Sequence, residues 1–368
     1  MGIFCEINLH KPVDGAFVPG ETVSGSIRYA VDKDFTVNRT IVSLKGSGYL
    51  RVKDRIRKKN RQSDLYTNSE QYVDIDHVLQ KDVKGSVIPY GQYEANFSFK
   101  LPEEIPPSFT YDEIIPRYTI RCRISYYVRI KFERPGMFQF NKHFKKEITV
   151  VSGVKPRLPT SPTVFGEQKK LFQPFKSKPS IVNIKTSVEN CVVQPGGKIV
   201  LNYEILNDTN VTIKSVETKL KEVQVFKPRA HLDVTVSKDV PLTKTKTALI
   251  NKGETQNMLI VINLPSDIKS IENSKIVSRD YIVKITAELP MPYINASLEI
   301  PVQIGDINCD VPVYADPPPT YWEAMGENGA GVVILLCHPQ LKYQAIVIMW
   351  AQQPTVCLPT KQLTRNSP

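Results

Sequence analysis

The residues best suited to a defined chemistry are in the run Pro317–Tyr321, where three consecutive prolines precede a threonine and a tyrosine. Within this run, Pro318, Pro319, Thr320 and Tyr321 fit PPxY, the pattern of peptides that bind WW domains. Consecutive prolines hold φ at about −65°, so the backbone is already a polyproline II helix and loses little entropy on binding. An aromatic groove receives the proline rings, and a second pocket receives the tyrosine ring. The motif therefore predicts a WW-domain-binding site, and a proline-rich turn is the alternative.

Positive charge is concentrated in the segment Arg51–Arg61, whose seven cations oppose one acid, Asp54. This segment has a charge of +6, which is more than half of the net charge of +11. The cations are Arg51, Lys53, Arg55, Arg57, Lys58, Lys59 and Arg61. The segment favours contact with anionic lipid, with an acidic or phosphorylated cargo tail, or with nucleic acid, and a solvated loop is the alternative. Nucleic acid fits least, because no aromatic residues are interleaved with these cations.

A second group of cations lies on an expected long strand, Tyr118–Phe132. Apolar and polar residues alternate along this whole range, which predicts one buried face and one solvent-facing face. The cations of the polar face are Arg121, Arg123, Arg129 and Lys131. This stripe is suited to receive an acidic or phosphorylated cytoplasmic tail. The alternative is an ordinary strand face with acidic partners on neighbouring strands.

The sequence shows no recognisable catalytic or metal-binding pattern. The five histidines are isolated, and nucleophile-elbow, P-loop, dinucleotide-binding and zinc-protease motifs are lacking. The six cysteines include no CxxC pair and no Cys/His pair at zinc-ligand spacing, which favours reduced thiols. We therefore expect no catalytic residue, no metal and no cofactor.

Length and composition limit the class of protein. A chain of 368 residues with 41% hydrophobic residues suggests about two folded domains and a tail. Its 28 prolines against 18 glycines disfavour long helices and coiled coils. The N-terminus does not resemble a secretory signal, and apolar runs are shorter than the roughly 18 residues of a membrane span. We expect a cytoplasmic protein on these grounds.

An internal repeat indicates how the strands are organised. Four landmarks recur in the same order, with 24 residues between the first glycine and the second landmark, and 17 between the third and the fourth. They are Pro19–Gly20, Leu44–Lys45, Leu101–Pro102 and Tyr118 in the first copy, and Pro195–Gly196, Leu220–Lys221, Leu264–Pro265 and Tyr281 in the second. Two similar β-sandwiches, each packing alternating faces sheet on sheet, explain this pattern.

The repeat and the prolines divide the chain into four regions. Residues 1–152 are expected to form one sandwich and residues 180–305 another. Residues 153–179 contain five closely spaced prolines and several lysines, which predicts a linker. Residues 306–368 are expected to be a mostly unstructured, flexible tail that contains the PPxY motif. The predicted fold class is all-β, with two tandem immunoglobulin-like sandwiches.

With these features, the sequence resembles the α-arrestins, which are also called arrestin-domain-containing proteins. The resemblance rests on PGE-x-V-x-G-x-I at Pro19–Ile27, on PGG-x-I at Pro195–Ile199, and on the PPxY motif behind the second sandwich. It covers residues 1 to about 325. The resemblance implies an N-terminal and a C-terminal arrestin-like sandwich. It also implies a non-catalytic adaptor that selects membrane cargo for ubiquitination, endocytosis and sorting.

The partners implied by the resemblance are WW domains of HECT-type ubiquitin ligases and cytoplasmic tails of membrane receptors or transporters. An anionic membrane surface is a further expected contact, nucleic acid is not, and the expected location is peripheral, at the plasma membrane and endosomes. One alternative is an arrestin-fold coat subunit of the retromer kind that recruits no ligase. A basic nucleic-acid-binding protein is another. The apolar tail segments Gly331–Cys337 and Ala345–Ala351 have no assigned role.

Overall fold

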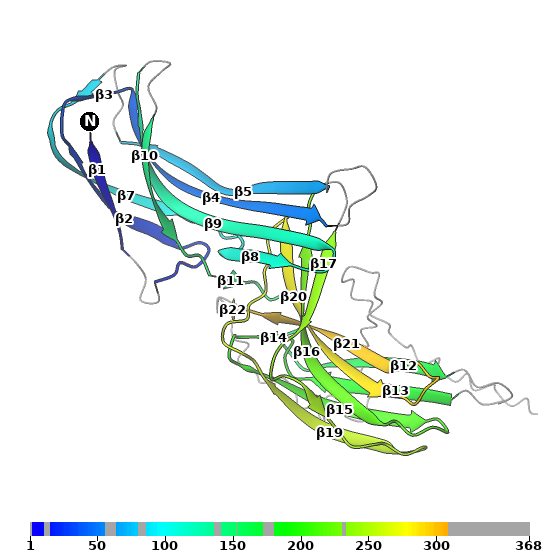
Figure 1. Ribbon diagram of the computed structural model, residues 1–368. Coiled ribbons are helices and arrows are strands. Elements are labelled where there is room, and N and C mark those ends of the chain that lie inside the picture. The colour runs from blue at the N-terminus through cyan, green and yellow to red at the C-terminus, as the bar shows by residue number, and fades with distance from the viewer. Residues whose placement is uncertain are drawn as a thin grey trace, which may run out of the picture.

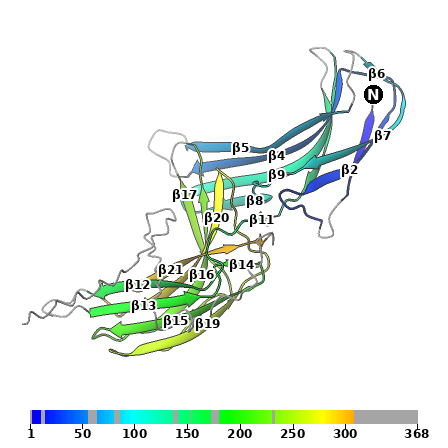
Figure 2. The same ribbon diagram turned by 180° about the vertical axis from the view of Figure 1, so that it is seen from behind.

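The computed structural model describes residues 2–10, 15–55, 64–79, 86–135, 141–151, 153–171, 180–229 and 233–307. All regular elements in these ranges are strands. Figures 1 and 2 show two β-sandwiches placed end to end, the first in blue to cyan and the second in green to orange. The predicted all-β fold of two tandem sandwiches is therefore confirmed. Among the described residues, no helix is long and apolar enough to cross a membrane.

The first sandwich consists of two antiparallel sheets. One has the order β1-β2-β7, and the other has the order β10-β9-β4-β5, with β8 also paired to β9. A short pair, β3-β6, lies apart from both sheets. The strands are β1 (Ile3–Leu9), β2 (Thr22–Val31), β3 (Phe35–Val37), β4 (Arg39–Asp54), β5 (Leu65–Val78), β6 (Ser86–Ile88), β7 (Gly91–Lys100), β8 (Phe109–Ile114), β9 (Tyr118–Glu133) and β10 (Lys142–Ile148).

The second sandwich repeats this plan with one extra strand in each sheet. Its sheets have the orders β12-β13-β15-β19 and β14-β21-β20-β16-β17, with β18 also paired to β16. A short parallel pair, β11-β22, connects the two ends of this region. The strands are β11 (Gly153–Val154), β12 (Thr163–Leu171), β13 (Ser180–Val188), β14 (Val192–Val193), β15 (Lys198–Asp208), β16 (Ser215–Phe226), β17 (Val234–Asp239), β18 (Thr245–Lys246), β19 (Thr255–Asn263), β20 (Val277–Glu288), β21 (Ala296–Ile304) and β22 (Asp306–Ile307).

Strand β9 confirms the long strand that the sequence predicts. Every second residue from Tyr118 to Phe132 is buried, and the residues between them are partly or fully exposed. The apolar face packs into the core of the first sandwich, where Tyr126 is completely buried. The Tyr126 hydroxyl donates a hydrogen bond to the Pro106 carbonyl oxygen at 2.6 Å, so this polar atom is satisfied inside the core.

The Pro-Gly and Leu-Pro landmarks have the same structural role in both sandwiches, whereas Tyr118 begins β9 and Tyr281 lies inside β20. Gly20 and Gly196 have φ values of 86° and 74°, a left-handed conformation that glycine adopts without steric penalty. The Gly20 amide donates to the Pro102 carbonyl oxygen at 3.2 Å, and the Gly196 amide donates to that of Pro265 at 3.1 Å. Each glycine turn is thereby tied to the end of a distant strand, which explains why the Leu-Pro landmarks recur with it.

The expected linker at 153–179 differs from the structure. Thr163–Leu171 forms β12, which pairs antiparallel with β13 along its whole length. Phe165 and Leu171 are buried in the core of the second sandwich. The prolines lie before and after this strand rather than inside it, so they leave its backbone hydrogen bonds intact. The second sandwich therefore begins at β12, and the proline-rich composition concealed a strand.

The two sandwiches share a hydrophobic core at their junction. Residues from the ends of β16, β17 and β20 belong to the same buried cluster as the interior of the first sandwich, and they include Phe226, Val234 and Val277. The Tyr111 and Phe226 rings lie 4.8 Å apart, centroid to centroid. Polar contacts surround this core, among them a hydrogen bond of 2.8 Å between Tyr72 Oη and Ser274 Oγ. The junction therefore resembles the inside of one domain.

Candidate functional site

The PPxY motif lies outside the described residues, which end at Ile307 in β22. Pro318, Pro319, Thr320 and Tyr321 therefore remain a prediction from sequence. Strand β22 pairs with β11, so the chain leaves the second sandwich beside the segment that enters it. The motif begins eleven residues after this point.

The basic segment is divided between strand and undescribed chain. Arg51 and Lys53 lie on the exposed face of β4, and Arg55 follows that strand. An Arg55 guanidinium nitrogen donates a hydrogen bond to the Ile115 carbonyl oxygen at 3.3 Å. Four further predicted contacts lie outside the described residues, namely Arg57, Lys58, Lys59 and Arg61.

Strand register brings part of the basic segment and part of the basic stripe together. Arg51 on β4 lies directly opposite Arg121 on β9, and Lys53 lies opposite Thr119. These four residues line a cavity of about 240 Å³, named here the β4–β9 pocket. Like charges on directly opposed strand positions repel each other unless an anion lies near. The pocket is thus a concave site with three cations.

Acidic partners are distributed unevenly around this pocket. Asp112 on β8 accepts a hydrogen bond from Arg121 at 3.1 Å, which neutralises one of the three cations. Among the described residues, no acidic side chain forms an ion pair with Arg51 or Lys53. Within the described part of the chain, Arg51 and Lys53 are therefore two uncompensated charges that an anionic ligand could meet.

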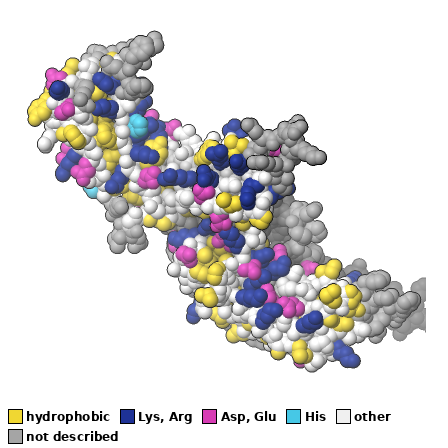
Figure 3. Space-filling view, viewed as in Figure 1, with side chains coloured by type: hydrophobic (Ala, Val, Ile, Leu, Met, Phe, Trp, Pro, Cys, Tyr) yellow, Lys and Arg dark blue, Asp and Glu magenta, His cyan; other side chains and the backbone are white. Residues whose placement is uncertain are grey.

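The rest of the stripe on β9 is largely neutralised or partly buried. Glu147 on β10 pairs with Arg123 at 3.0 Å, and Glu133 pairs with Lys131 at 2.8 Å. Arg129 is partly buried, between Ser43 on β4 and Lys145 on β10 in the strand register. In Figure 3, a row of Lys and Arg side chains crosses the first sandwich, with Asp and Glu side chains among them. For Arg123 and Lys131, the ordinary strand face with acidic partners describes the structure better than a free cationic stripe.

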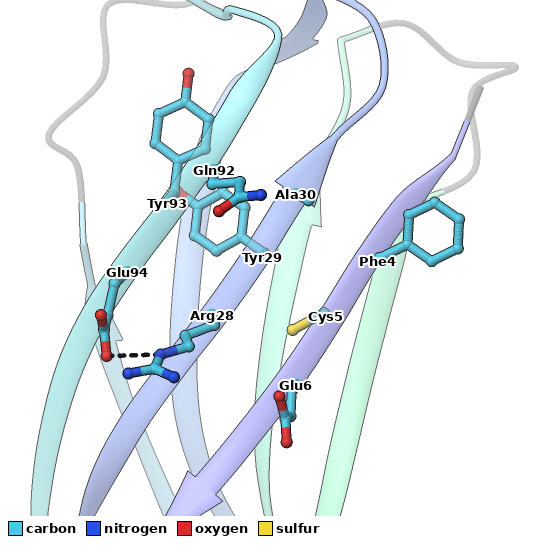
Figure 4. A pocket seen from close by; sticks show the side chains of 9 residues that line it. All are labelled: Phe4, Cys5, Glu6, Arg28, Tyr29, Ala30, Gln92, Tyr93 and Glu94. Carbon is cyan, nitrogen blue, oxygen red and sulfur yellow. Dashed lines mark hydrogen bonds and ion pairs between the residues drawn. The ribbon is translucent and has the colours of Figure 1, made fainter.

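A larger hollow of about 670 Å³ lies on β1, β2 and β7, and sequence reasoning did not identify it. Figure 4 shows its lining, in which Arg28 pairs with Glu94 at 3.1 Å. The Tyr29 and Tyr93 rings stack at 5.1 Å between centroids. Burial raises the pKa of the Cys5 thiol to about 11, so it stays protonated at neutral pH and is a poor nucleophile. These contacts join residues of three separate strands, so no local sequence motif predicts them.

Two further chemical features concern metals and charge at the junction. Within the described ranges, no group of three His, Cys, Asp or Glu side chains is placed to hold a metal ion. At the junction, Lys238 Nζ lies 2.5 Å from a Glu113 carboxylate oxygen. This hydrogen bond lowers the pKa of Glu113. It joins the two sandwiches by an ion pair that the sequence did not suggest.

Comparison with known families accounts for both sandwiches. Residues 5–156 match the N-terminal domain of arrestin (or S-antigen), and residues 178–309 match its C-terminal domain. The chain belongs to the arrestin family. It is 21% identical over 320 residues to Arrestin domain-containing protein 5 of Homo sapiens, covering 84% of this chain and 90% of that protein. It is 24% identical over 324 residues to Arrestin domain-containing protein 17 of Caenorhabditis elegans, covering 82% and 70%.

These relatives place the chain among the arrestin-domain-containing proteins, or α-arrestins, as the sequence motifs predicted. The membership is consistent with a trafficking adaptor. The two matched regions leave a gap at 157–177, and strand β12 of this α-arrestin lies inside it. The PPxY motif follows the second matched region and belongs to neither domain.

Proposed function

We propose that this α-arrestin is an adaptor that links membrane cargo to a HECT-type ubiquitin ligase with WW domains. The PPxY motif behind the last strand of the second sandwich carries this proposal. Membership of the arrestin family supports the adaptor role, which requires no catalysis. In the proposed arrangement, the sandwiches bind cargo at the plasma membrane or endosomes, and the tail brings the ligase to it.

The ligase contact rests on the chemistry of four residues. Pro318 and Pro319 present preformed polyproline II geometry, and Tyr321 inserts its ring in an apolar pocket. Asp316 and Glu323 flank the motif and favour a basic rim on the partner. Phosphorylation of Tyr321 introduces a charge that an apolar pocket cannot solvate, so it would release the ligase.

The proposed cargo contact is the β4–β9 pocket. Arg51 and Lys53 lie on a rigid strand and lack acidic partners in the described part of the chain. An acidic or phosphorylated cytoplasmic tail would supply the missing negative charge, and charge-assisted hydrogen bonds to guanidinium are among the stronger ones. The adjoining basic segment places further cations next to the same strand end, where anionic lipid is available.

The ligase contact is tested by titrating the full chain with a WW domain from a HECT-type ligase. Tyr321→Ala and Pro319→Ala should each weaken binding by about tenfold or more, because each removes a side chain that fills a partner pocket. Tyr314→Ala is the matched control, since Tyr314 follows only one proline in the nearby Pro312–Tyr314 segment. Binding that is indifferent to Tyr321 would contradict the proposal and favour a coat subunit without ligase recruitment.

The cargo contact is tested with a phosphoserine-containing acidic peptide as the probe. Arg51→Ala combined with Lys53→Ala should weaken peptide binding by about tenfold, because two uncompensated cations are removed. Arg123→Ala is the matched control, because Glu147 already neutralises Arg123. Vesicles containing phosphatidylserine form a second arm. If the double variant loses vesicle binding and keeps peptide binding, the pocket serves the membrane and the cargo assignment fails.

A further inference from the structure

Strand β19 is an edge strand with an unusual composition. It pairs with β15 on one side and forms the border of the sheet β12-β13-β15-β19. Figures 1 and 2 both show it as the outermost strand of the second sandwich, on the side away from the first. Its sequence, Thr-Gln-Asn-Met-Leu-Ile-Val-Ile-Asn, contains no charged residue, no glycine and no proline. Such an exposed edge is a template for pairing with another strand.

The hydrogen bonds between β19 and β15 show which backbone groups of β19 face the open edge. The Leu264 amide donates to the Gly197 carbonyl oxygen at 2.9 Å, and the Asn207 amide donates to that of Glu254 at 3.0 Å. In an antiparallel pair, bonded and non-bonded positions alternate, so the even-numbered residues of β19 bond to β15. The odd-numbered residues therefore direct their N–H and C=O groups outward. These residues are Thr255, Asn257, Leu259, Val261 and Asn263.

The side chains of the same odd-numbered residues point to solvent, and those in the middle of the strand are apolar. Leu259 is 63% exposed and Val261 is 44% exposed. Val261 lies opposite Val200 of β15, which is half-buried. Figure 3 shows hydrophobic side chains along this border of the second sandwich. An approaching strand would thus find unpaired backbone groups and apolar side chains at one place.

The longer described edge strands differ in charge. Among the described edge strands longer than three residues, β19 is the one without a charged side chain. Its counterpart in the first sandwich, β7, contains Glu94 and Lys100, and β12 at the opposite edge of the same sheet contains Glu167, Lys169 and Lys170. Charged edge residues discourage strand addition, so this contrast singles out β19.

We propose that β19 pairs antiparallel with β19 of a second copy of this chain and joins two sheets into one. A two-fold axis at Leu259 places that residue opposite itself, Asn257 opposite Val261, and Thr255 opposite Asn263. All these positions have outward-facing backbone groups, as this register requires. A neutral strand brings no like charges together when it meets its own copy, and Leu259 of both copies would form the apolar centre. Charge neutrality therefore favours a second copy over an acidic or basic peptide.

The mass of the full chain in solution tests the proposal directly. Light scattering over rising micromolar concentrations should show a shift from 41.6 kDa to twice that mass. Leu259→Lys should weaken the dimer by at least about tenfold, because it opposes two ammonium groups at the axis. Asn96→Lys is the matched control, since Asn96 is exposed on β7 and precedes Leu101 by the same five residues that separate Leu259 from Leu264.

Engineered cysteines test the register without introducing charge. Leu259→Cys should form an intermolecular disulfide on treatment with diamide, because opposed bonded residues lie within disulfide reach. The two thiols form one S–S bond and transfer two electrons and two protons to diamide. Thr255→Cys should not cross-link, because this register places residue 255 opposite residue 263. It retains every native cysteine and therefore serves as the control.

Several outcomes would overturn the dimer. A wild-type chain that stays at 41.6 kDa throughout, a dimer that survives Leu259→Lys, or equal cross-linking of both cysteine variants would each do so. Loss of the dimer through Ile334→Lys in the apolar tail segment, without loss through Leu259→Lys, would show that the tail drives association. None of these measurements involves a WW domain, so they are independent of the proposed ligase contact.

Discussion

The two sandwiches share a strand plan and differ in the charge placed on it. On the central strand β4, Lys45 lies between Asp74 and Asp76 of the neighbouring β5. On β16, which has the same place in the second sandwich, the signs are reversed, because Glu217 is surrounded by lysines. The edges differ as well, since β7 is charged and β19 is neutral.

This difference shows which positions of the repeat can differ in residue type between the two sandwiches. The buried face of each strand and the glycine turns are shared, because they determine whether the sheets pack and the strands end correctly. Solvent-facing positions are under no such constraint, so each sandwich presents its own surface. In the first sandwich this surface holds the β4–β9 pocket, and in the second it holds the β19 edge.

The largest expected effect concerns the shared core at the junction. Because both sandwiches contribute to this core, we expect them not to unfold independently. Phe226→Ala should lower the free energy of unfolding by about 3–5 kcal/mol, as for other buried aromatic truncations. The loss should also reduce hydrogen-exchange protection in β8 and β9, because Phe226 packs against Tyr111 of the first sandwich. Phe4→Ala, at a 72% exposed position, should change stability by less than about 0.5 kcal/mol. Unchanged hydrogen-exchange protection in β8 and β9 would show that the two sandwiches are independent in stability.

The second effect concerns one cross-strand position filled differently in the two sandwiches. Gly46 faces Tyr126, whereas Glu222 faces Tyr281. A Cβ atom on Gly46 would overlap the buried Tyr126 ring, so Gly46→Ala should lower the free energy of unfolding by about 1–3 kcal/mol. Urea denaturation measures this change. Gly166→Ala on β12 has its nearest neighbour at 3.7 Å and should be close to neutral, and equal losses at both sites would contradict the packing argument.

The third effect is a pH dependence of stability that arises from Glu217 and the lysines around it. Lys244 first, and then Lys219, lower the pKa of Glu217 from 4.5 to about 2. A carboxyl with a lowered folded-state pKa stabilises the fold fully above about pH 4.5, and this contribution is lost as the pH falls towards 2. Urea unfolding at about pH 6 and about pH 3 should show a loss of roughly 1–3 kcal/mol from this group. Glu217→Gln should lack that part of the pH dependence, and an unchanged profile would exclude Glu217 as its source.

The smallest effect concerns the ion pair across the junction. Lys238 and Glu113 are 47% and 42% exposed, so solvent screens their attraction. Lys238→Ala should therefore lower the free energy of unfolding by less than about 1 kcal/mol, and added salt should reduce that difference further. A loss as large as that of Phe226→Ala would mean that charge, rather than the apolar core, holds the sandwiches together.

Much of the fold was predictable because its signals are local. The alternation from Tyr118 to Phe132 predicted β9, and the Pro-Gly and Leu-Pro landmarks predicted the repeat. Strand β12 was concealed, because the prolines before and after it suggested a linker, although it pairs with the next strand along the chain, β13. For the candidate site, the sequence named Arg51 and Arg121 separately, and only strand register shows that they are neighbours.

The sequence alone determined that this chain forms two arrestin-like sandwiches and that its tail contains a WW-type motif. These features follow from residue type and spacing along the chain, which set strand faces, turns and polyproline geometry. Only the tertiary structure decided which cations meet an acid, since Asp112 and Glu147 come from other strands. It also decided that the sandwiches share a core and that β19 lies unprotected at an edge. Register and strand order are properties of the whole sheet, because each pairing depends on every strand beside it.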